Sequence, residues 1–351
     1  MKWSEYATLA QKSLEKFYQA DTEEQFLNNF YPIKNIEEDN KVFNYWWLAH
    51  LVEVRLDAYL RTKQQADLDV AEWTYAHNKN RNGGTLVHDF YDDMLWNALA
   101  AFRLYKVTGK SVYLDDAKLV WQDLVDTGWN DTMGGGFAWR RPQMYYKNTP
   151  VNAPFIILAC WLYNELQEQK YLDWAIKTYE WQTKILVRAD GFVEDGINRL
   201  EDGGIDREWK FTYNQGVYIG ANLELYRITK DSKYLEMANK TAEVSLQELT
   251  ENGIFKEEGS GGDEGLFKGI FYRYFTDLIE ETNNQSFRDF VTSSCQVLVD
   301  HAMVDGYLLM GMNWKEKPSS QIPYSAELSG MIALEMAAKE TLRMADYAKL
   351  G

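Results

Sequence analysis

A repeated segment constrains the fold of this chain more than any other feature of its sequence. The stretches LYKVTGKSVYLDDAK from Leu104, LYNELQEQKYLDWAIK from Leu162 and LYRITKDSKYLEMANK from Leu225 share one pattern. In each, a second tyrosine follows the first after eight residues, as Tyr113 follows Tyr105. The copies recur after 58 and 63 residues, enough for two helices and a long loop. Internal periodicity of this kind is typical of stacked supersecondary units.

The two helices of each repeat differ in how their polar residues are distributed. In the segment 111–126, apolar residues form one stripe and charged residues the other, as in a helix with one face in solvent. The segments 93–107, 151–166 and 216–228 are instead apolar nearly all round. A helix without a polar face must be surrounded by protein. Inner and outer helices are therefore expected to alternate along the chain.

Extending this pattern predicts six helix pairs. The outer helices are expected near residues 3–19, 65–78, 111–126, 170–187, 232–248 and 286–301, and the inner helices near 45–61, 92–107, 151–166, 214–228, 265–281 and 324–341. The predicted fold is all-α, an (α/α)6 barrel of six inner and six outer helices in a single domain spanning residues 1–351. An open helical solenoid has the same periodicity, and closure is inferred from the buried inner set and the count of six.

The predicted connections are asymmetric. Inner-to-outer turns are short, such as 108–110 and 229–231, whereas outer-to-inner loops are long and rich in glycine, aromatic and acidic residues. Long loops inside a compact domain usually carry function. The functional face is therefore expected where the inner helices begin.

Aromatic, amide and carboxylate side chains collect at these helix starts. Such groups suit an uncharged, hydroxyl-rich ligand, and an aromatic content of 15% agrees with stacking on sugars. Capping of helix amino termini is the alternative explanation for each single Asp or Asn. The stretches concerned are 44–47, 91–93, 148–152, 213–215, 263–264 and 324–327.

Composition excludes several classes of partner. A net charge of −16 disfavours nucleic acid, whose phosphates are bound by Lys and Arg. The longest apolar run, 153–163, is far shorter than the roughly 20 residues of a membrane span. Four scattered histidines without zinc-site spacing and the Gly run 134–136 without a following Lys predict no metal, no phosphate loop and no cofactor.

Two aspartates, Asp92 and Asp93, stand side by side where an inner helix begins. Glycosidases that form a covalent intermediate use one ionised carboxylate as nucleophile and one protonated carboxyl as acid and base, roughly 5 to 5.5 Å apart. Neighbours in one helical turn can reach that separation, and their mutual repulsion favours one protonated partner. A purely structural role is the alternative, because Asp115 and Asp116 form the same dipeptide on an outer helix.

Five motifs together resemble glycoside hydrolase family 76, the endo-α-1,6-mannanases with an (α/α)6 barrel. They are NYWWLAH at 44–50, YDDMLWNALA at 91–100, GGGFAW at 134–139, KNTPVNAP at 147–154 and TYNQG at 212–216. Their order and their spread over nearly the whole chain make the resemblance specific.

The resemblance implies a retaining mechanism in which Asp92 is the nucleophile and Asp93 the acid/base. The substrate would be α-1,6-linked mannose in oligo- or polysaccharides. The residues expected to bind it, from the motifs and the helix starts, are Trp46, Trp47, Tyr91, Phe137, Trp139, Asn148, Asn152, Tyr213, Asn214, Gln215, Asp263 and Glu327.

Location and competing functions complete the expectations. Family members are mostly secreted, whereas the residues 1–17 read as a helix without an export signal, so a cytoplasmic enzyme acting on imported oligosaccharides is expected. Sugar 2-epimerases and unsaturated glycuronyl hydrolases share the barrel. Epimerases are expected to bring paired His to the pocket and glycuronyl hydrolases basic residues, so the scarcity of His and the acidic helix starts disfavour both. A non-catalytic glycan-binding protein is the third hypothesis, and the intact aspartate pair argues against it.

Overall fold

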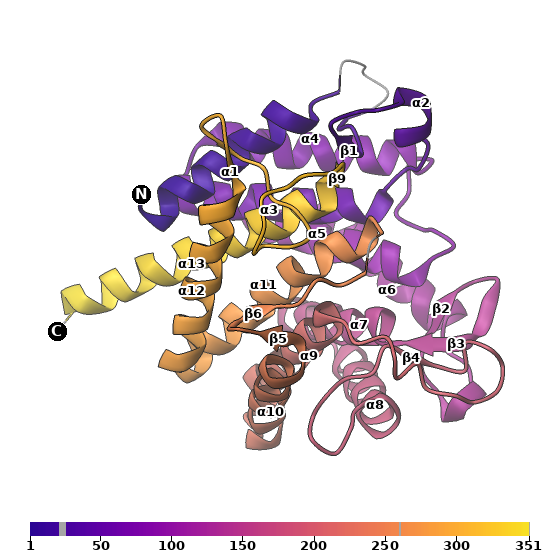
Figure 1. Ribbon diagram of the computed structural model, residues 1–351. Coiled ribbons are helices and arrows are strands. Elements are labelled where there is room, and N and C mark those ends of the chain that lie inside the picture. Colours follow the sequence, from indigo (N-terminus) through magenta and orange to yellow (C-terminus); the bar gives the residue numbers. More distant parts are fainter. Residues whose placement is uncertain (21–25, 260, 351) are drawn as a thin grey trace. The chain divides into compact units, whose positions relative to one another are not determined.

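A computed structural model describes residues 1–20, 26–259 and 261–350 (Figure 1). The chain forms two compact units. The first unit comprises residues 1–77 and 250–351, and the second unit comprises residues 78–249. That the units make one domain stays a prediction. None of the described helices is long and apolar enough to cross a membrane.

The predicted alternation of helices is confirmed. The outer helices are α1 (Trp3–Tyr18), α4 (Gln65–Arg81), α6 (Ser111–Thr127), α8 (Gln169–Leu186), α10 (Ser232–Leu249) and α12 (Gln285–Ala302). The inner helices are α3 (Tyr45–Thr62), α5 (Tyr91–Thr108), α7 (Thr149–Leu166), α9 (Thr212–Thr229), α11 (Phe267–Thr282) and α13 (Tyr324–Leu350). Six helices of each kind in alternation are the element pattern of an (α/α)6 barrel. One further turn of helix, α2 (Ile36–Asp39), lies between α1 and α3.

Burial follows the two sequence patterns. In α6 the buried positions are 113, 116, 117, 120, 121 and 124, a single stripe at helical spacing. In α5 every residue of the stretch 94–102 is buried, and in α7 every residue of 149–160. The inner helices are therefore buried on all their faces, whereas each outer helix buries only the face that packs against them.

A left-handed residue ends each of five inner helices. Lys63, Gly109, Gln167, Lys230 and Asn283 have φ between 55° and 70° and donate a backbone hydrogen bond into the preceding turn. This conformation reverses the chain within one turn, and the next outer helix begins two residues later each time. The short inner-to-outer turns are thus confirmed, and the long loops are left at the other helix ends.

All the strands lie in the long outer-to-inner loops. The second unit holds an antiparallel three-stranded sheet of β2 (Ala138–Arg140), β3 (Gln143–Asn148) and β4 (Gly196–Ile197). The first unit holds two-stranded pairs: β1 (Phe30–Tyr31) with β9 (Ile322–Pro323), β5 (Thr250–Glu251) with β6 (Ile254–Phe255), and β7 (Met303–Val304) with β8 (Tyr307–Leu308). The three-stranded sheet joins two functional loops, because β3 leads directly into α7 and β4 belongs to the loop before α9.

The Gly run 134–136 lets its loop pack tightly against tryptophan. Gly136 has φ +85°, and a Cβ atom there would lie 2.7 Å from the Trp181 ring. The Gly136 carbonyl accepts a hydrogen bond of 2.7 Å from Nζ of Lys147, a fully buried side chain on β3. Burial lowers the pKa of Lys147 to about 7. The run therefore shapes the loop that carries β2 into the site.

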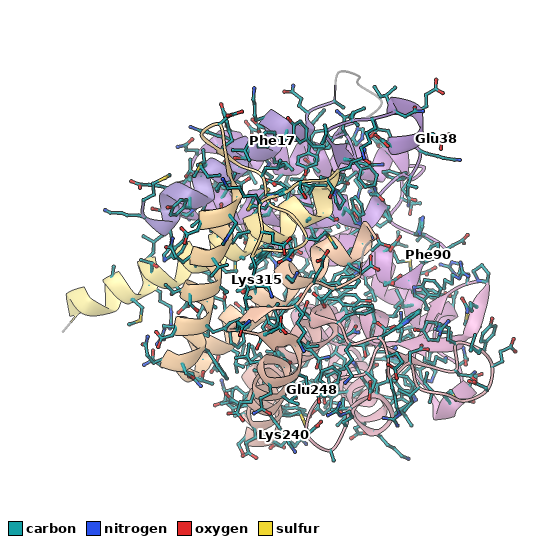
Figure 2. All side chains as sticks on the ribbon, in the orientation of Figure 1. Phe17, Glu38, Phe90, Lys240, Glu248 and Lys315 are labelled. Carbon is teal, nitrogen blue, oxygen red and sulfur yellow. The ribbon has the colours of Figure 1, made fainter. Side chains whose placement is uncertain are left out.

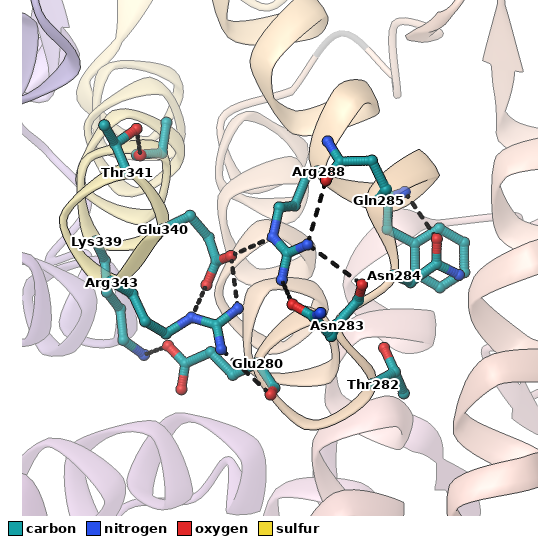
Figure 3. A network of polar contacts seen from close by, with 12 residues as sticks. Glu280, Thr282, Asn283, Asn284, Gln285, Arg288, Lys339, Glu340, Thr341 and Arg343 are labelled. Carbon is teal, nitrogen blue, oxygen red and sulfur yellow. Dashed lines mark hydrogen bonds and ion pairs between the residues drawn. The ribbon is translucent and has the colours of Figure 1, made fainter. Parts of the chain in front are cut away.

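A polar network joins α11, α12 and α13 within the first unit (Figure 3). Glu340 is buried and accepts hydrogen bonds of 3.1 Å from Arg288 and from Arg343. Arg288 also donates to the Asn283 carbonyl, one of the groups left unpaired where α11 ends. Lys339 pairs with Glu280 of α11 at 2.7 Å. Arg288 and Arg343 thus join α12 and α13 at the Glu340 carboxylate, and the contacts to Asn283 and Glu280 connect both helices to the end of α11.

Candidate active site

The aspartate pair occupies the first turn of α5. Phe90, labelled in Figure 2, is the N-cap residue and contributes no side-chain cap. Asp92 Oδ1 instead accepts a 3.0 Å hydrogen bond from the backbone N–H of Asp93. Capping of the helix start thus accounts for the hydrogen bond of one Asp92 oxygen. Both aspartates remain partly exposed, as residues that contact a substrate must be.

The second oxygen of Asp92 binds a tryptophan of the three-stranded sheet. Trp139 Nε1 donates to Asp92 Oδ2 at 3.0 Å. The ring is held edge-to-face by Phe90 and Tyr146, and the Arg140 guanidinium lies 4.6 Å from its centroid. A donor aimed at a carboxylate favours its charged form. Trp139 therefore positions Asp92 and stabilises it as an anion, which is the state a nucleophile needs.

Asp93 has a different neighbour. His88 Nδ1 lies 3.8 Å from Asp93 Oδ2 and accepts a hydrogen bond from the Phe90 N–H, so this nitrogen carries no proton. Burial lowers the pKa of His88, which keeps the ring neutral. Two adjacent carboxyls in unlike environments suit the pairing of one ionised and one protonated group.

Sequence reasoning missed a third aspartate, Asp195, which directly precedes β4. It is 3% exposed. Its Oδ1 accepts from Asn214 Nδ2 at 2.8 Å and from the Tyr213 hydroxyl at 3.3 Å, and its Oδ2 accepts from the Tyr146 hydroxyl at 2.9 Å. Tyr213 and Asn214, predicted as substrate-binding residues, thus meet at a buried carboxyl. Its only sequence signal is an acidic pair inside the apolar stretch 192–197.

Two predicted amides hold loops in place. Asn152 Oδ1 accepts from the Phe137 N–H at 2.9 Å while its Nδ2 donates to the Phe137 carbonyl at 3.1 Å. Gln215 does the same for Val193, with distances of 2.9 and 2.7 Å. Both amides are fully buried. Each therefore clamps the main chain of the loop that precedes its own helix.

Three other predicted residues of the second unit are also buried. The Phe137 ring packs against Phe155, with centroids 4.1 Å apart, and belongs to the core. The Tyr91 hydroxyl donates to the Thr127 carbonyl at 3.0 Å. Asn148, 4% exposed, keeps its Oδ1 without a hydrogen-bond partner among the described residues. Packing accounts for Phe137 and Tyr91, and Asn148 alone of the three offers an unused polar atom.

Four of the predicted residues, Trp46, Trp47, Asp263 and Glu327, belong to the first unit. Asp263 Oδ1 accepts from Trp46 Nε1 at 3.0 Å and from Trp47 Nε1 at 2.7 Å, so one carboxylate orients both indoles. Trp47 is buried, whereas Trp46 is partly exposed. Glu327 is fully buried, and its Oε2 accepts from the Met310 N–H at 2.7 Å. Burial raises the pKa of Glu327 well above that of an ordinary glutamate.

Asp195 leads to a prediction for stability. Burial raises its pKa from 3.8 to about 6. A raised pKa means that the folded state holds the proton more tightly, so this stabilisation is present below pH 3.8 and is lost as the pH rises through about 6. Relative to Asp195→Asn, the wild type should lose about 3 kcal/mol of unfolding free energy between acidic and neutral pH. Urea unfolding of both proteins at several pH values measures this difference, and a constant difference would contradict it.

The inner and outer helices alternate, and aspartates and aromatic rings lie where the inner helices begin. These features are typical of the helical class of carbohydrate-active enzymes. The sequence profile of glycosyl hydrolase family 76 matches residues 2–348, nearly the whole chain. The chain belongs to this family. The predicted family and (α/α)6 fold class are thereby confirmed.

Solved structures of high similarity agree. The Lin0763 protein of Listeria innocua is 84% identical, with a TM-score of 0.97, over 98% of this chain and 99% of that one. The GH76A α-1,6-mannanase of Salegentibacter sp. HEL1_6 is 36% identical, with a TM-score of 0.88, over 96% of this chain and 99% of that one. An inactive variant of that enzyme, with two consecutive aspartates replaced by asparagine, is in complex with α-1,6-mannotriose.

Curated relatives are more distant. The mannan endo-1,6-α-mannosidase DCW1 of Saccharomyces cerevisiae is 28% identical over 201 residues, which are 52% of this chain. The match spans 44% of the length of DCW1.

Proposed function

We propose that this protein is a retaining, endo-acting glycoside hydrolase that cleaves α-1,6-linked mannose chains. The observation that carries the proposal is the hydrogen bond from Trp139 to Asp92 beside Asp93 in the first turn of α5. The inactive consecutive-aspartate variant of the Salegentibacter mannanase and its mannotriose ligand support it.

The reaction would proceed in two displacements. Asp93, protonated, gives its proton to the glycosidic oxygen while Asp92 attacks the anomeric carbon and the leaving sugar departs. A covalent glycosyl-aspartate forms, with Trp139 still on the other Asp92 oxygen. Asp93, now ionised, takes a proton from water, which displaces Asp92 and restores both groups. Two inversions leave the product in the α configuration of the substrate.

Stereochemistry tests this mechanism directly. Proton NMR of the freshly released reducing end, recorded before mutarotation, should show the α anomer first, because retaining enzymes pass through two inversions. Linear α-1,6-manno-oligosaccharides are the substrates, and α-1,2- and α-1,3-linked mannosides and α-glucosides serve as specificity controls. Initial appearance of the β anomer would remove the nucleophile role from Asp92. Binding without turnover would favour the hypothesis of a glycan-binding protein.

We also propose a cytoplasmic location and imported oligosaccharides as the physiological substrate. Cys160 and Cys295 are both buried free thiols, which is compatible with a reducing compartment. Fractionation of the source cells, followed by activity measurement in each fraction, tests the location.

A further inference from the structure

A row of three aromatic rings runs along the end of the loop before α9. Trp209, Phe211 and Tyr213 occupy alternate positions, and neighbouring ring centroids lie 6.3 and 6.1 Å apart. The Tyr213 hydroxyl donates to buried Asp195 at one end of the row. Tyr213 and Phe211 are half-buried, and Trp209 at the other end is 38% exposed. The row therefore leads from the buried carboxyl out to solvent.

A series of side-chain contacts within the second unit connects the aromatic row to the aspartate pair. Asp92 binds Trp139, the Trp139 ring meets the Tyr146 ring edge-on at 5.8 Å, and the Tyr146 hydroxyl donates to Asp195. Asp195 then accepts from Tyr213. A continuous series of side-chain contacts thus joins the proposed nucleophile to the inner end of the aromatic row.

Trp209, at the outer end, is held in place although it is exposed. The Arg199 guanidinium lies 4.4 Å from the centre of its ring. Arg199 is itself fixed by Asp206, whose Oδ1 lies 2.9 Å from Arg199 Nε. The Trp209 N–H donates to the Asp206 carbonyl at 3.2 Å, which ties the backbone to the same residue. An exposed ring with this much support is preorganised for a ligand.

We propose that Trp209, Phe211 and Tyr213 form an outer subsite for sugar units of the mannan chain that lie beyond the cleavage point. This inference rests on the proposed function and adds a determinant of chain length to it. Flat aromatic rings bind uncharged sugars through their apolar C–H faces. The three rings are uncharged, so they suit a neutral glycan. Oligosaccharides long enough to reach Trp209 should therefore bind more tightly than short ones.

The test compares ligand lengths in matched variants of the full chain. Calorimetry measures binding of linear α-1,6-mannotriose and α-1,6-mannohexaose to the Asp92→Asn, Asp93→Asn protein, with and without Trp209→Ala. We expect Trp209→Ala to weaken mannohexaose binding about tenfold and mannotriose binding less than about twofold, and Trp209→Phe to restore most of the loss. Leu200→Ala is the matched control, because Leu200 is an exposed apolar residue of the same loop, at 69%.

The outcomes separate the two proposals. Equal weakening for both lengths, or none for either, would overturn the subsite, provided that thermal melts show each variant folded. Absence of hydrolysis by the wild type, with a length dependence that Trp209→Ala abolishes, would overturn the proposed reaction and leave the subsite standing. If the wild type hydrolyses the substrate and the preference for long chains persists in Trp209→Ala, the proposed reaction stands and the subsite is overturned.

Discussion

Replacement of Asp92 or Asp93 by asparagine is expected to lower the turnover of α-1,6-manno-oligosaccharides by about 1000-fold or more. An asparagine at position 92 keeps the shape of the side chain but cannot form the glycosyl-aspartate bond, and an asparagine at position 93 cannot transfer a proton to the leaving oxygen. The fold should persist, because the amide oxygen at position 92 can still accept from the backbone N–H of residue 93, as the carboxylate does. Oligosaccharide hydrolysis followed by product chromatography, with thermal melts in parallel, checks both statements.

A substrate whose leaving group is weakly basic distinguishes the nucleophile role of Asp92 from the acid role of Asp93. On an activated aryl mannoside the first step needs little protonation, so Asp93→Asn should retain much more of its first step than Asp92→Asn. Asp115→Asn is the matched control, because Asp115 belongs to the other Asp-Asp dipeptide and its side chain is 65% exposed on α6. Near wild-type turnover of unactivated substrate by either variant at position 92 or 93 would make the pair structural.

The second large effect is expected at Trp139. Trp139→Phe removes the indole N–H that binds Asp92 Oδ2 but keeps an aromatic ring between Phe90 and Tyr146. Hydrogen bonds to charged groups contribute about 1.5–3 kcal/mol, so kcat/KM should fall by about 10- to 100-fold. Because the donor favours the ionised carboxylate, its loss should move the acidic limb of the pH profile of kcat/KM to higher pH.

A structural role for Trp139 predicts a different result. If the ring acts only by packing, Trp139→Phe would lower the melting temperature and leave the pH profile of the folded enzyme where it was. Trp73→Phe on α4 controls for the loss of an indole elsewhere, because Trp73 is 56% exposed and its ring contacts Phe26 and His77. The profile, and not the rate alone, therefore decides whether Trp139 acts on Asp92.

The helices were predictable from sequence because their signal is local. Periodic apolar residues mark the outer helices, and continuous apolar runs mark the inner ones, so the predicted helices lie within a few residues of the observed ones. The exception is α13, which was predicted to end near residue 341 and continues to Leu350. The strands of the long loops were not foreseen, because all but β3 have only two or three residues and show no alternation of side chains. Two of the five pairings among the described strands, β1 with β9 and β3 with β4, also join segments far apart in the chain.

Residue type identified the site only in part. Asp92, Asp93 and Trp139 do lie together. An amide suited to a sugar hydroxyl is equally suited to a peptide group, and only burial shows that Asn152 binds the main chain of its loop. Asp195 was missed because its environment depends on the path of a loop that no motif marks.

The amide clamps have a consequence for how this scaffold can change. Asn152 and Gln215 bind only the peptide N–H and C=O of Phe137 and Val193, so these hydrogen bonds do not depend on which apolar side chain fills the buried position. Each of these two loops is thereby anchored through its main chain, at a residue whose side chain is buried. Loops of other lengths and compositions could be grafted between an outer helix and its clamp without moving the inner-helix start. Divergence of substrate preference in such proteins can then proceed by exchange of loops, while the helices and the aspartate pair stay as they are.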